Sequence, residues 1–236
     1  MMNILAIVCH PDDMEITCGG TLLKYKKAGH AVTVCNVANG NMGHYSIMPD
    51  ELRKIRRKET QKACDIGGFK SVCADIDDLT VDSSDKQQLR KIVQIIREEK
   101  PDIIITHHPD DYCSDHRETS KLVFKASFDA TVPHFMPECG KAVDLIPLYY
   151  ADTDLGINFT PTEYVDISDE MDTKEKMLAC HESQIVWLKE HDGYDVIAEQ
   201  RKLAASRGTQ SGVKYAEGFA PAFVSGRLRT YRVLPE

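Results

Sequence analysis

Short apolar runs alternate with amphipathic segments through the first half of the chain. Runs rich in β-branched and apolar residues predict buried strands at 3–9, 31–38, 71–76 and 102–106. Apolar residues at helical spacing predict helices at 19–28, 51–66, 85–99 and 116–130. Strands that alternate with helices pair in parallel through right-handed crossovers. The pattern therefore predicts an α/β protein with a Rossmann-like three-layer fold and a mostly parallel central sheet, formed by one domain over 1–236.

Residues typical of helix ends place several of the boundaries. Asp50 is the expected N-cap of the helix over 51–66, and Gly67-Gly68 follows that helix. Ser84-Asp85-Lys86-Gln87 fits a capping box for the next helix, which Pro101 ends. Beyond residue 140 the pattern predicts strands at 145–150, 163–167 and 229–233. The stretch over 170–211 is predicted to be mostly helical.

Composition argues against several classes of protein. The 236 residues include 37 Asp and Glu against 29 Lys and Arg, so the net charge is −8, which disfavours nucleic acid or an anionic membrane as the main partner. The apolar runs are far too short to cross a bilayer. The N-terminus has no basic region before a long apolar core, so we expect a cytoplasmic protein whose eight cysteines are free thiols. The sequence leaves open whether the chain forms a homo-oligomer.

Two polar clusters each follow a predicted strand. His10-Pro11-Asp12-Asp13 comes directly after the strand over 3–9. Residues 107–116, which read His-His-Pro-Asp-Asp-Tyr-Cys-Ser-Asp-His, come after the strand over 102–106. In open α/β sheets, ligands bind beyond the carboxyl ends of the strands. We therefore expect the two clusters to form one site.

The side chains in these clusters suit a divalent metal ion. A catalytic site offers the ion three protein ligands and leaves one position for water. His10, Asp13 and His116 supply two imidazoles and one carboxylate, which suits zinc or iron(II). Pro11 biases His10 away from the helical region, so residues 10 and 13 can turn back on one ion. Asp12 is then free to accept a proton from a water molecule on that ion.

Each cluster alone also has a simpler interpretation. His-Pro-Asp-Asp fits a turn with an aspartate N-cap, and Asp115-His116 fits the first turn of a helix. The presence of both clusters after near-continuous apolar strands favours the metal site. The roles of His107 and His108 stay open, and we expect one of them to pack at the strand end.

Further motifs follow in order along the chain. The first cluster extends to Glu15 and Gly19-Gly20, and the second extends to Arg117. The further motifs are Arg56-Arg57-Lys58-Glu59 with Gly67-Gly68, Asp166-Ile167-Ser168, His181 with Ser183-Gln184, and Tyr215-Ala216-Glu217-Gly218-Phe219. In this order they resemble the LmbE-like (PIG-L) family of zinc-dependent N-acetylglucosaminyl deacetylases. The resemblance covers nearly the whole chain.

The resemblance implies a function and roles for individual residues. It implies that His10, Asp13 and His116 bind zinc and that Asp12 is the general base. It also implies that Arg56 contacts hydroxyl groups of the substrate. The substrate would be an N-acetylglucosaminyl conjugate, such as a thiol-precursor glycoside, a chito-oligosaccharide or a glycolipid.

The chain departs from the family pattern at Cys113. Relatives usually have His-Pro-Asp-His where this chain has Cys-Ser-Asp-His, and their additional histidine stabilises the oxyanion and helps to protonate the leaving amine. In relatives the residue matching Asp115 orients that histidine. A thiol carries no positive charge. One interpretation is that His108, His44 or another histidine substitutes; a second is that activity is reduced or the substrate differs. A third is that Cys113 is a further metal ligand, a redox-sensitive thiol or a neutral thiol that packs.

The sequence thus predicts a metal-dependent hydrolase that removes the N-acetyl group from an N-acetylglucosamine-containing conjugate by Asp12-assisted attack of water. Two alternatives remain. One is a hydrolase of another amide. The other is a metal- or sugar-binding member of the family whose catalysis is lost or altered because Cys113 replaces the histidine.

Overall fold

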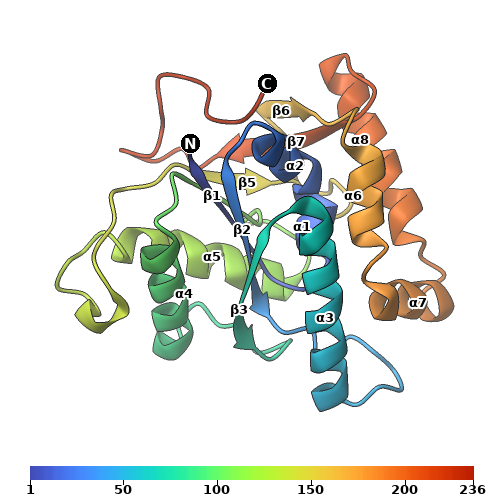
Figure 1. The fold of residues 1–236 in the computed structure, drawn as a ribbon, viewed down its shortest axis with the longest axis horizontal. Coiled ribbons are helices and arrows are strands. Elements are labelled where there is room, and N and C mark those ends of the chain that lie inside the picture. The colour runs from blue at the N-terminus through green and yellow to red at the C-terminus, as the bar shows by residue number, and fades with distance from the viewer.

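A seven-stranded sheet forms the centre of the computed structural model, which describes residues 1–236 (Figure 1). The strand order is β3-β2-β1-β4-β5-β7-β6. The strands are β1 (Asn3–Val8), β2 (Ala31–Ala38), β3 (Lys70–Ile76), β4 (Ile103–Thr106), β5 (Leu148–Ala151), β6 (Glu163–Asp166) and β7 (Ala216–Pro221). The pairs from β3 to β5 are parallel, and β7 is antiparallel to both of its neighbours. The predicted α/β fold with a mostly parallel sheet is confirmed.

Helices cover both faces of this sheet (Figure 1). They are α1 (Asp13–Thr17), α2 (Gly19–Lys27), α3 (Pro49–Gly67), α4 (Lys86–Glu99), α5 (Ser114–Asp129), α6 (Met171–Leu178), α7 (Glu182–His191) and α8 (Val196–Ser211), with a short 3-10 turn at Pro137–Cys139. None of them combines the length and the apolar character that a membrane span requires.

The side chains of β1 alternate between two cores. Ile4 and Ala6 pack on the face that carries α2, α3 and α6, whereas Leu5 and Ile7 pack on the face that carries α4 and α5. All four side chains are buried, because parallel strands covered on both faces have no polar side. This explains why the sequence shows continuous apolar runs and not alternation.

Two predicted helix caps and one predicted strand are wrong. The N-cap of α3 is Met48 and not Asp50, because Pro49 occupies the first turn, where its missing N–H costs nothing. The N-cap of α4 is Asp85 and not Ser84, because the Asp85 carboxylate accepts the amide protons of Gln87 and Gln88. The strand expected at 229–233 does not form: β6 is the outermost strand on that side, and this segment contacts it through the Arg232 side chain, which donates to the Tyr164 carbonyl.

The sheet brings the two polar clusters together. β1 and β4 are parallel neighbours, with Ile7 opposite Thr106. Their carboxyl ends therefore open at the same edge, where the loop after β1 leads into α1 and the loop after β4 leads into α5. The topology thus places residues 10–13 beside residues 107–116.

Candidate metal centre

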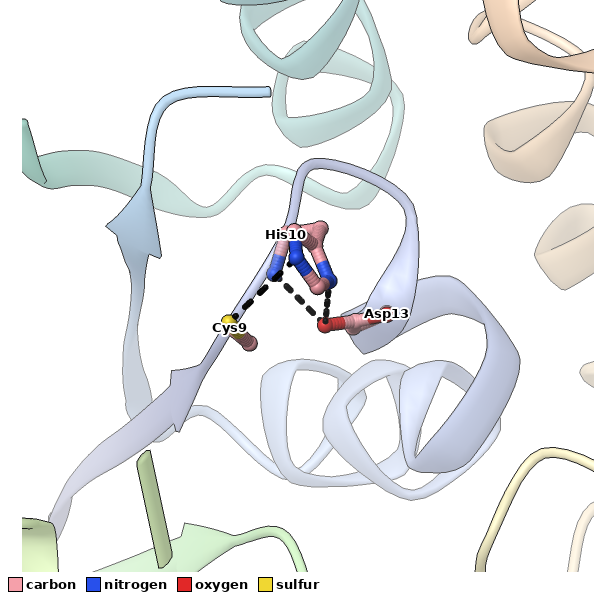
Figure 2. Close-up of side chains that lie close together, drawn as sticks. All are labelled: Cys9, His10 and Asp13. Carbon is pink, nitrogen blue, oxygen red and sulfur yellow. Dashed lines mark hydrogen bonds and ion pairs between the residues drawn. The ribbon is translucent and has the colours of Figure 1, made fainter. Parts of the chain in front are cut away.

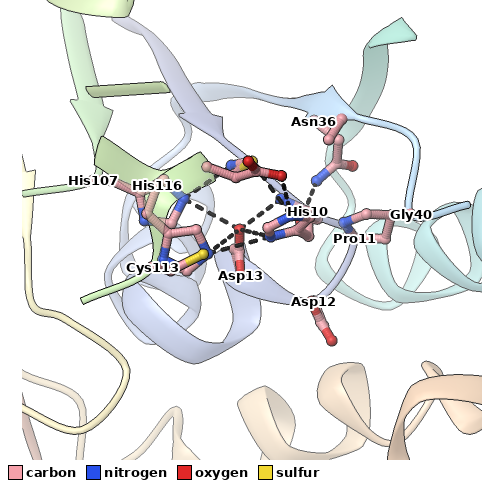
Figure 3. Close-up of polar contacts among 12 residues, drawn as sticks. His10, Pro11, Asp12, Asp13, Asn36, Gly40, His107, Cys113 and His116 are labelled. Atoms are coloured by element: carbon pink, nitrogen blue, oxygen red, sulfur yellow. Dashed lines mark hydrogen bonds and ion pairs between the residues drawn. The ribbon is translucent and has the colours of Figure 1, made fainter. Parts of the chain in front are cut away.

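Three side chains from the two loops converge on one point. His10 Nδ1 lies 3.4 Å from Asp13 Oδ2 and 3.2 Å from His116 Nε2, and His116 Nε2 lies 3.3 Å from Asp13 Oδ2. Figure 2 shows His10 and Asp13 turned toward each other beside Cys9 at the end of β1, and Figure 3 adds His116 from α5. The structure therefore brings together the three residues that the sequence proposed as ligands.

The loop backbone produces this convergence. Asp12 adopts a left-handed conformation with φ of 101°, which reverses the chain between His10 and α1. The His10 amide donates to Asp13 Oδ2 at 2.6 Å, and the Asn36 side chain donates to the His10 carbonyl at 2.8 Å. As a result the carboxylate of Asp13 turns back over His10, while Asp12 points away from the three converging side chains (Figure 3).

The donor set fits a divalent metal ion. Ligand atoms bound at about 2.0–2.1 Å in a tetrahedral site lie roughly 3.4 Å apart, which matches the three observed separations. The side chains of Asp13 and His116 are buried, and two imidazoles with one carboxylate suit zinc or iron(II). Burial opposes the charge on Asp13, but His116 and His107 hold the pKa of its carboxyl well below the ordinary value. The carboxylate is therefore in the ionised form that a metal requires.

Each of the two imidazoles faces a second carboxylate through its other ring nitrogen. His10 Nε2 lies 3.4 Å from Asp115 Oδ2, and His116 Nδ1 lies 3.3 Å from Asp111 Oδ2. Carboxylates in this position orient metal-binding histidines and fix their tautomers. Backbone amides of Leu79 and Cys113 in turn donate to Asp115 and Asp111. Asp115 thus faces His10, and Asp111 is a site residue that the sequence analysis did not single out.

His107 is the buried histidine at the end of β4. Its ring stacks on His116 with centroids 4.0 Å apart, and its Nε2 accepts the Cys9 amide proton at 2.9 Å. The same Nε2 lies 3.1 Å from Asp13 Oδ2, and Nδ1 has no hydrogen-bond partner. His107 therefore packs on His116 and contacts Asp13, and the three residues together also form a group that could hold a metal ion. His107 directly follows the four-residue apolar strand β4, and this position indicates a buried side chain at the strand end.

Asp12 and Arg56 form a separate pair beside this centre. Arg56 Nη2 lies 3.2 Å from Asp12 Oδ2 and also donates to the Pro11 carbonyl. Both side chains are buried, and Gly40 leaves the space that the Arg56 side chain occupies. Burial raises the pKa of Asp12 to about 6, although Arg56 opposes the shift. A carboxylate with that pKa suits a general base that works near neutral pH.

Cys113 is the N-cap residue of α5 and lines a cavity that opens beside the three converging side chains. Burial opposes ionisation of the thiol, but the hydrogen bond and charge of His116 bring its pKa below the ordinary value. Neither histidine considered as a substitute lines the cavity. His108 packs edge-on against Phe159, with centroids 5.0 Å apart, and His44 stacks on Tyr45 at 4.9 Å.

A cavity of about 560 Å³ opens over the centre. His10, Asp12, Asp13, Arg56, Cys113 and His116 all line it, together with apolar side chains from α7 and α8. Asp78, Tyr112 and Asp154 also line the cavity, and the sequence analysis did not identify them. Asp78 accepts the amide protons of Gly40 and Met42 and so shapes one wall. The arrangement provides a ligand triangle, a separate carboxylate and room for a small organic substrate.

Comparisons with known proteins show what the sequence and the fold resemble. Residues 5–127 match the family model PIG-L, described as GlcNAc-PI de-N-acetylase. Diacetylchitobiose deacetylase of Thermococcus kodakarensis is 31% identical over 237 residues, which covers 95% of this chain and 84% of that protein.

Solved structures share the fold. N,N'-diacetylchitobiose deacetylase from Pyrococcus horikoshii superposes with a TM-score of 0.81 at 28% identity, covering 92% of this chain and 82% of that one. GalB of Pseudomonas putida KT2440, a 4-carboxy-2-hydroxymuconate hydratase, superposes with a TM-score of 0.82 at 23% identity, covering 97% of this chain and 100% of that one. This likeness concerns the fold only. The family match and the Thermococcus relative confirm the resemblance of the motifs, and the chain belongs to the PIG-L family.

Proposed function

We propose that this chain is a metal-dependent hydrolase that removes the N-acetyl group from an N-acetylglucosamine-containing conjugate. The convergence of His10 Nδ1, Asp13 Oδ2 and His116 Nε2 on the floor of the cavity carries the proposal. The Thermococcus relative is named for deacetylation of diacetylchitobiose, which supports this substrate class. Zinc is the proposed ion, with iron(II) as its rival.

Each residue of the site has a distinct task in this proposal. An ion held by the three ligands would polarise the acetamide carbonyl and lower the pKa of a water molecule. Asp12 accepts the proton of the attacking water, and Arg56 holds the Asp12 carboxylate in place. Asp111 and Asp115 keep the imidazoles of His116 and His10 oriented.

The departure at Cys113 supports a second candidate function. No imidazole lies at that position, and neither His44 nor His108 lines the cavity. A chain that binds an N-acetylated sugar or another amide, with lost or altered catalysis, would also fit this arrangement.

Acetate release tests the proposal. The purified protein is incubated with diacetylchitobiose and a panel of N-acetylglucosaminides, with chelator, and after zinc or iron(II) is added back under anaerobic conditions. We expect release that the chelator abolishes and that one of the two metals restores. Release that a chelator leaves unchanged would contradict the metal dependence, and sugar binding without acetate would favour the second candidate.

Two variants separate the proposed roles. Asp12→Asn should keep the bound metal and lose about 10²–10⁴ in rate, the usual contribution of a positioned general base. His116→Ala should lose the metal. Asp144→Asn, which changes an exposed carboxylate, is the matched control. Metal loss in Asp12→Asn, or full metal content in His116→Ala, would reverse the assignment.

A further inference from the structure

Asp154 is an aspartate of the cavity wall that comes from a third strand end. It lies three residues after β5, which is the parallel neighbour of β4. The loop after β5 therefore opens at the same sheet edge as the two loops of the metal centre. Asp154 lines the cavity together with Asp12 and His116, and the Gln200 side chain donates to its backbone carbonyl at 3.0 Å.

The carboxyl group of Asp154 has almost no polar partner. Its Oδ1 is shielded from solvent and accepts no hydrogen bond. Its Oδ2 has one contact, with the Tyr112 hydroxyl at 3.4 Å. Asp154 is half-buried, and a carboxylate oxygen that is shielded from water without a partner is costly, whereas the neutral acid is tolerated. The geometry therefore favours the protonated form of this side chain.

The charges around Asp154 oppose one another, and burial decides the direction of the shift in its pKa. Burial raises the pKa of Asp154 to about 7; His116 lowers it, and Asp13, Asp111 and Asp12 raise it. The phenols of Tyr112 and Tyr194 also lie near Asp154, and burial raises the pKa of each, so they carry no charge near neutral pH. Asp12, in contrast, is paired with Arg56. The cavity thus holds two carboxyl groups in different environments, which is the arrangement that separates a base from an acid.

We propose that Asp154 is the general acid that protonates the leaving amine in this chain, in place of the imidazole absent at position 113. This inference rests on the proposed deacetylase function. The water oxygen forms a bond to the acetamide carbon while one water proton passes to Asp12. The C–N bond then breaks, its electron pair stays on nitrogen, and the Asp154 proton moves to that nitrogen. The products are the free amine and acetic acid, and the proton held by Asp12 returns to Asp154 through solvent.

The test combines kinetics with pH dependence. Asp154→Asn should lower kcat for diacetylchitobiose by about 10²-fold or more while bound metal and KM stay close to wild type. In the pH–rate profile, the activity of the wild type should fall at high pH as Asp154 ionises. This basic limb of the profile should be absent in Asp154→Asn and present again in Asp154→Glu. Asp144→Asn, an exposed carboxylate between α5 and β5, is the control.

A stability measurement gives a second readout. The folded-state pKa of Asp154 lies above that of the unfolded chain, so ionisation destabilises the folded state as pH rises from about 4 through about 7. Asparagine removes that charge. The urea concentration at the unfolding midpoint of Asp154→Asn, minus that of the wild type, should therefore be larger at pH 8 than at pH 5.

The outcomes separate this inference from the proposed function. A wild type that releases no acetate would overturn both. An active wild type with Asp154→Asn of equal kcat and unchanged basic limb would overturn the role of Asp154 alone. A midpoint difference that stays constant between pH 5 and pH 8 would also contradict it, because the side chain would then not be held as the neutral acid.

Discussion

A buried ion pair ties α6 and β7 to the helices that follow β1. Lys174 Nζ lies 2.7 Å from Glu217 Oε1 and donates to the Ile16 carbonyl at 3.1 Å. Glu217 also accepts the amide protons of Gly20 and Thr21 at 2.9 and 2.8 Å, at the start of α2. The side chains of Lys174 and Glu217 are each only 3% exposed. The pair therefore anchors α1, whose first residue is the candidate metal ligand Asp13.

Replacing Lys174 by methionine should destabilise the protein strongly. The change keeps the aliphatic stem but leaves the Glu217 carboxylate buried without its cation, which costs about 3–5 kcal/mol. A domain with a total stability of about 5–15 kcal/mol would lose a large share of it. With an m-value of roughly 2–3 kcal/mol per molar urea, the unfolding midpoint should fall by about 1–2 M.

An exposed pair of the same length provides the control. Lys202 Nζ lies 2.7 Å from Glu199 Oε1, but the Lys202 side chain is 70% exposed. Lys202→Met should therefore cost less than about 1 kcal/mol. Adding Glu217→Gln to Lys174→Met should recover part of the loss, because no unpaired charge then remains buried. Equal midpoints for Lys174→Met and Lys202→Met would refute the reasoning.

Three further predictions concern the cavity. Cys113→His should raise acetate release from an N-acetylglucosaminide by up to about 10²–10³, since it adds a donor for the developing oxyanion, and an unchanged rate would contradict this. Trp187 stacks on Tyr45 at 5.2 Å and so joins α7 to the loop before α3, two segments that line the cavity through Leu188 and Gly43. Trp187→Ala should therefore raise KM about 10-fold and change kcat little in steady-state kinetics. Asp12→Gly should be more stable than Asp12→Ala by about 1–2 kcal/mol in urea, because only glycine adopts the left-handed backbone without strain.

Strands β1, β2 and β4 could be predicted because burial on both faces leaves a continuous apolar signal. β2 occupies 31–38, the range that its β-branched residues predicted. β7 was missed because Glu217, Gly218 and Pro221 are residues that strands usually avoid. Its conformation depends on pairing with β5 and β6, and Glu217 is buried there because Lys174 and the start of α2 neutralise it. These contacts are distant in sequence and leave no local pattern.

The site could be predicted where chemistry and chain position agree. His10, Asp13 and His116 are ligand types at strand ends, and the structure brings them together. Asp154 has no motif around it, and its character comes from burial and from the fold that places β5 beside β4. His108 was considered because it is a histidine near Cys113, yet it packs outside the cavity lining. Position at a strand end therefore identified the three candidate ligands but not the groups around them.

The two adjacent aspartates show why conformation decides roles that composition cannot. Asp12 and Asp13 are chemically identical, and either could bind a cation. The φ of 101° at Asp12 turns Asp13 toward His10, whose amide holds the Asp13 carboxylate, and leaves Asp12 facing Arg56. A left-handed backbone at a non-glycine residue costs roughly 1–2 kcal/mol and persists only where the surroundings impose it. That strain is confined to the residue whose side chain must leave the ligand triangle, so the backbone at residue 12 separates the proposed base from the proposed ligand.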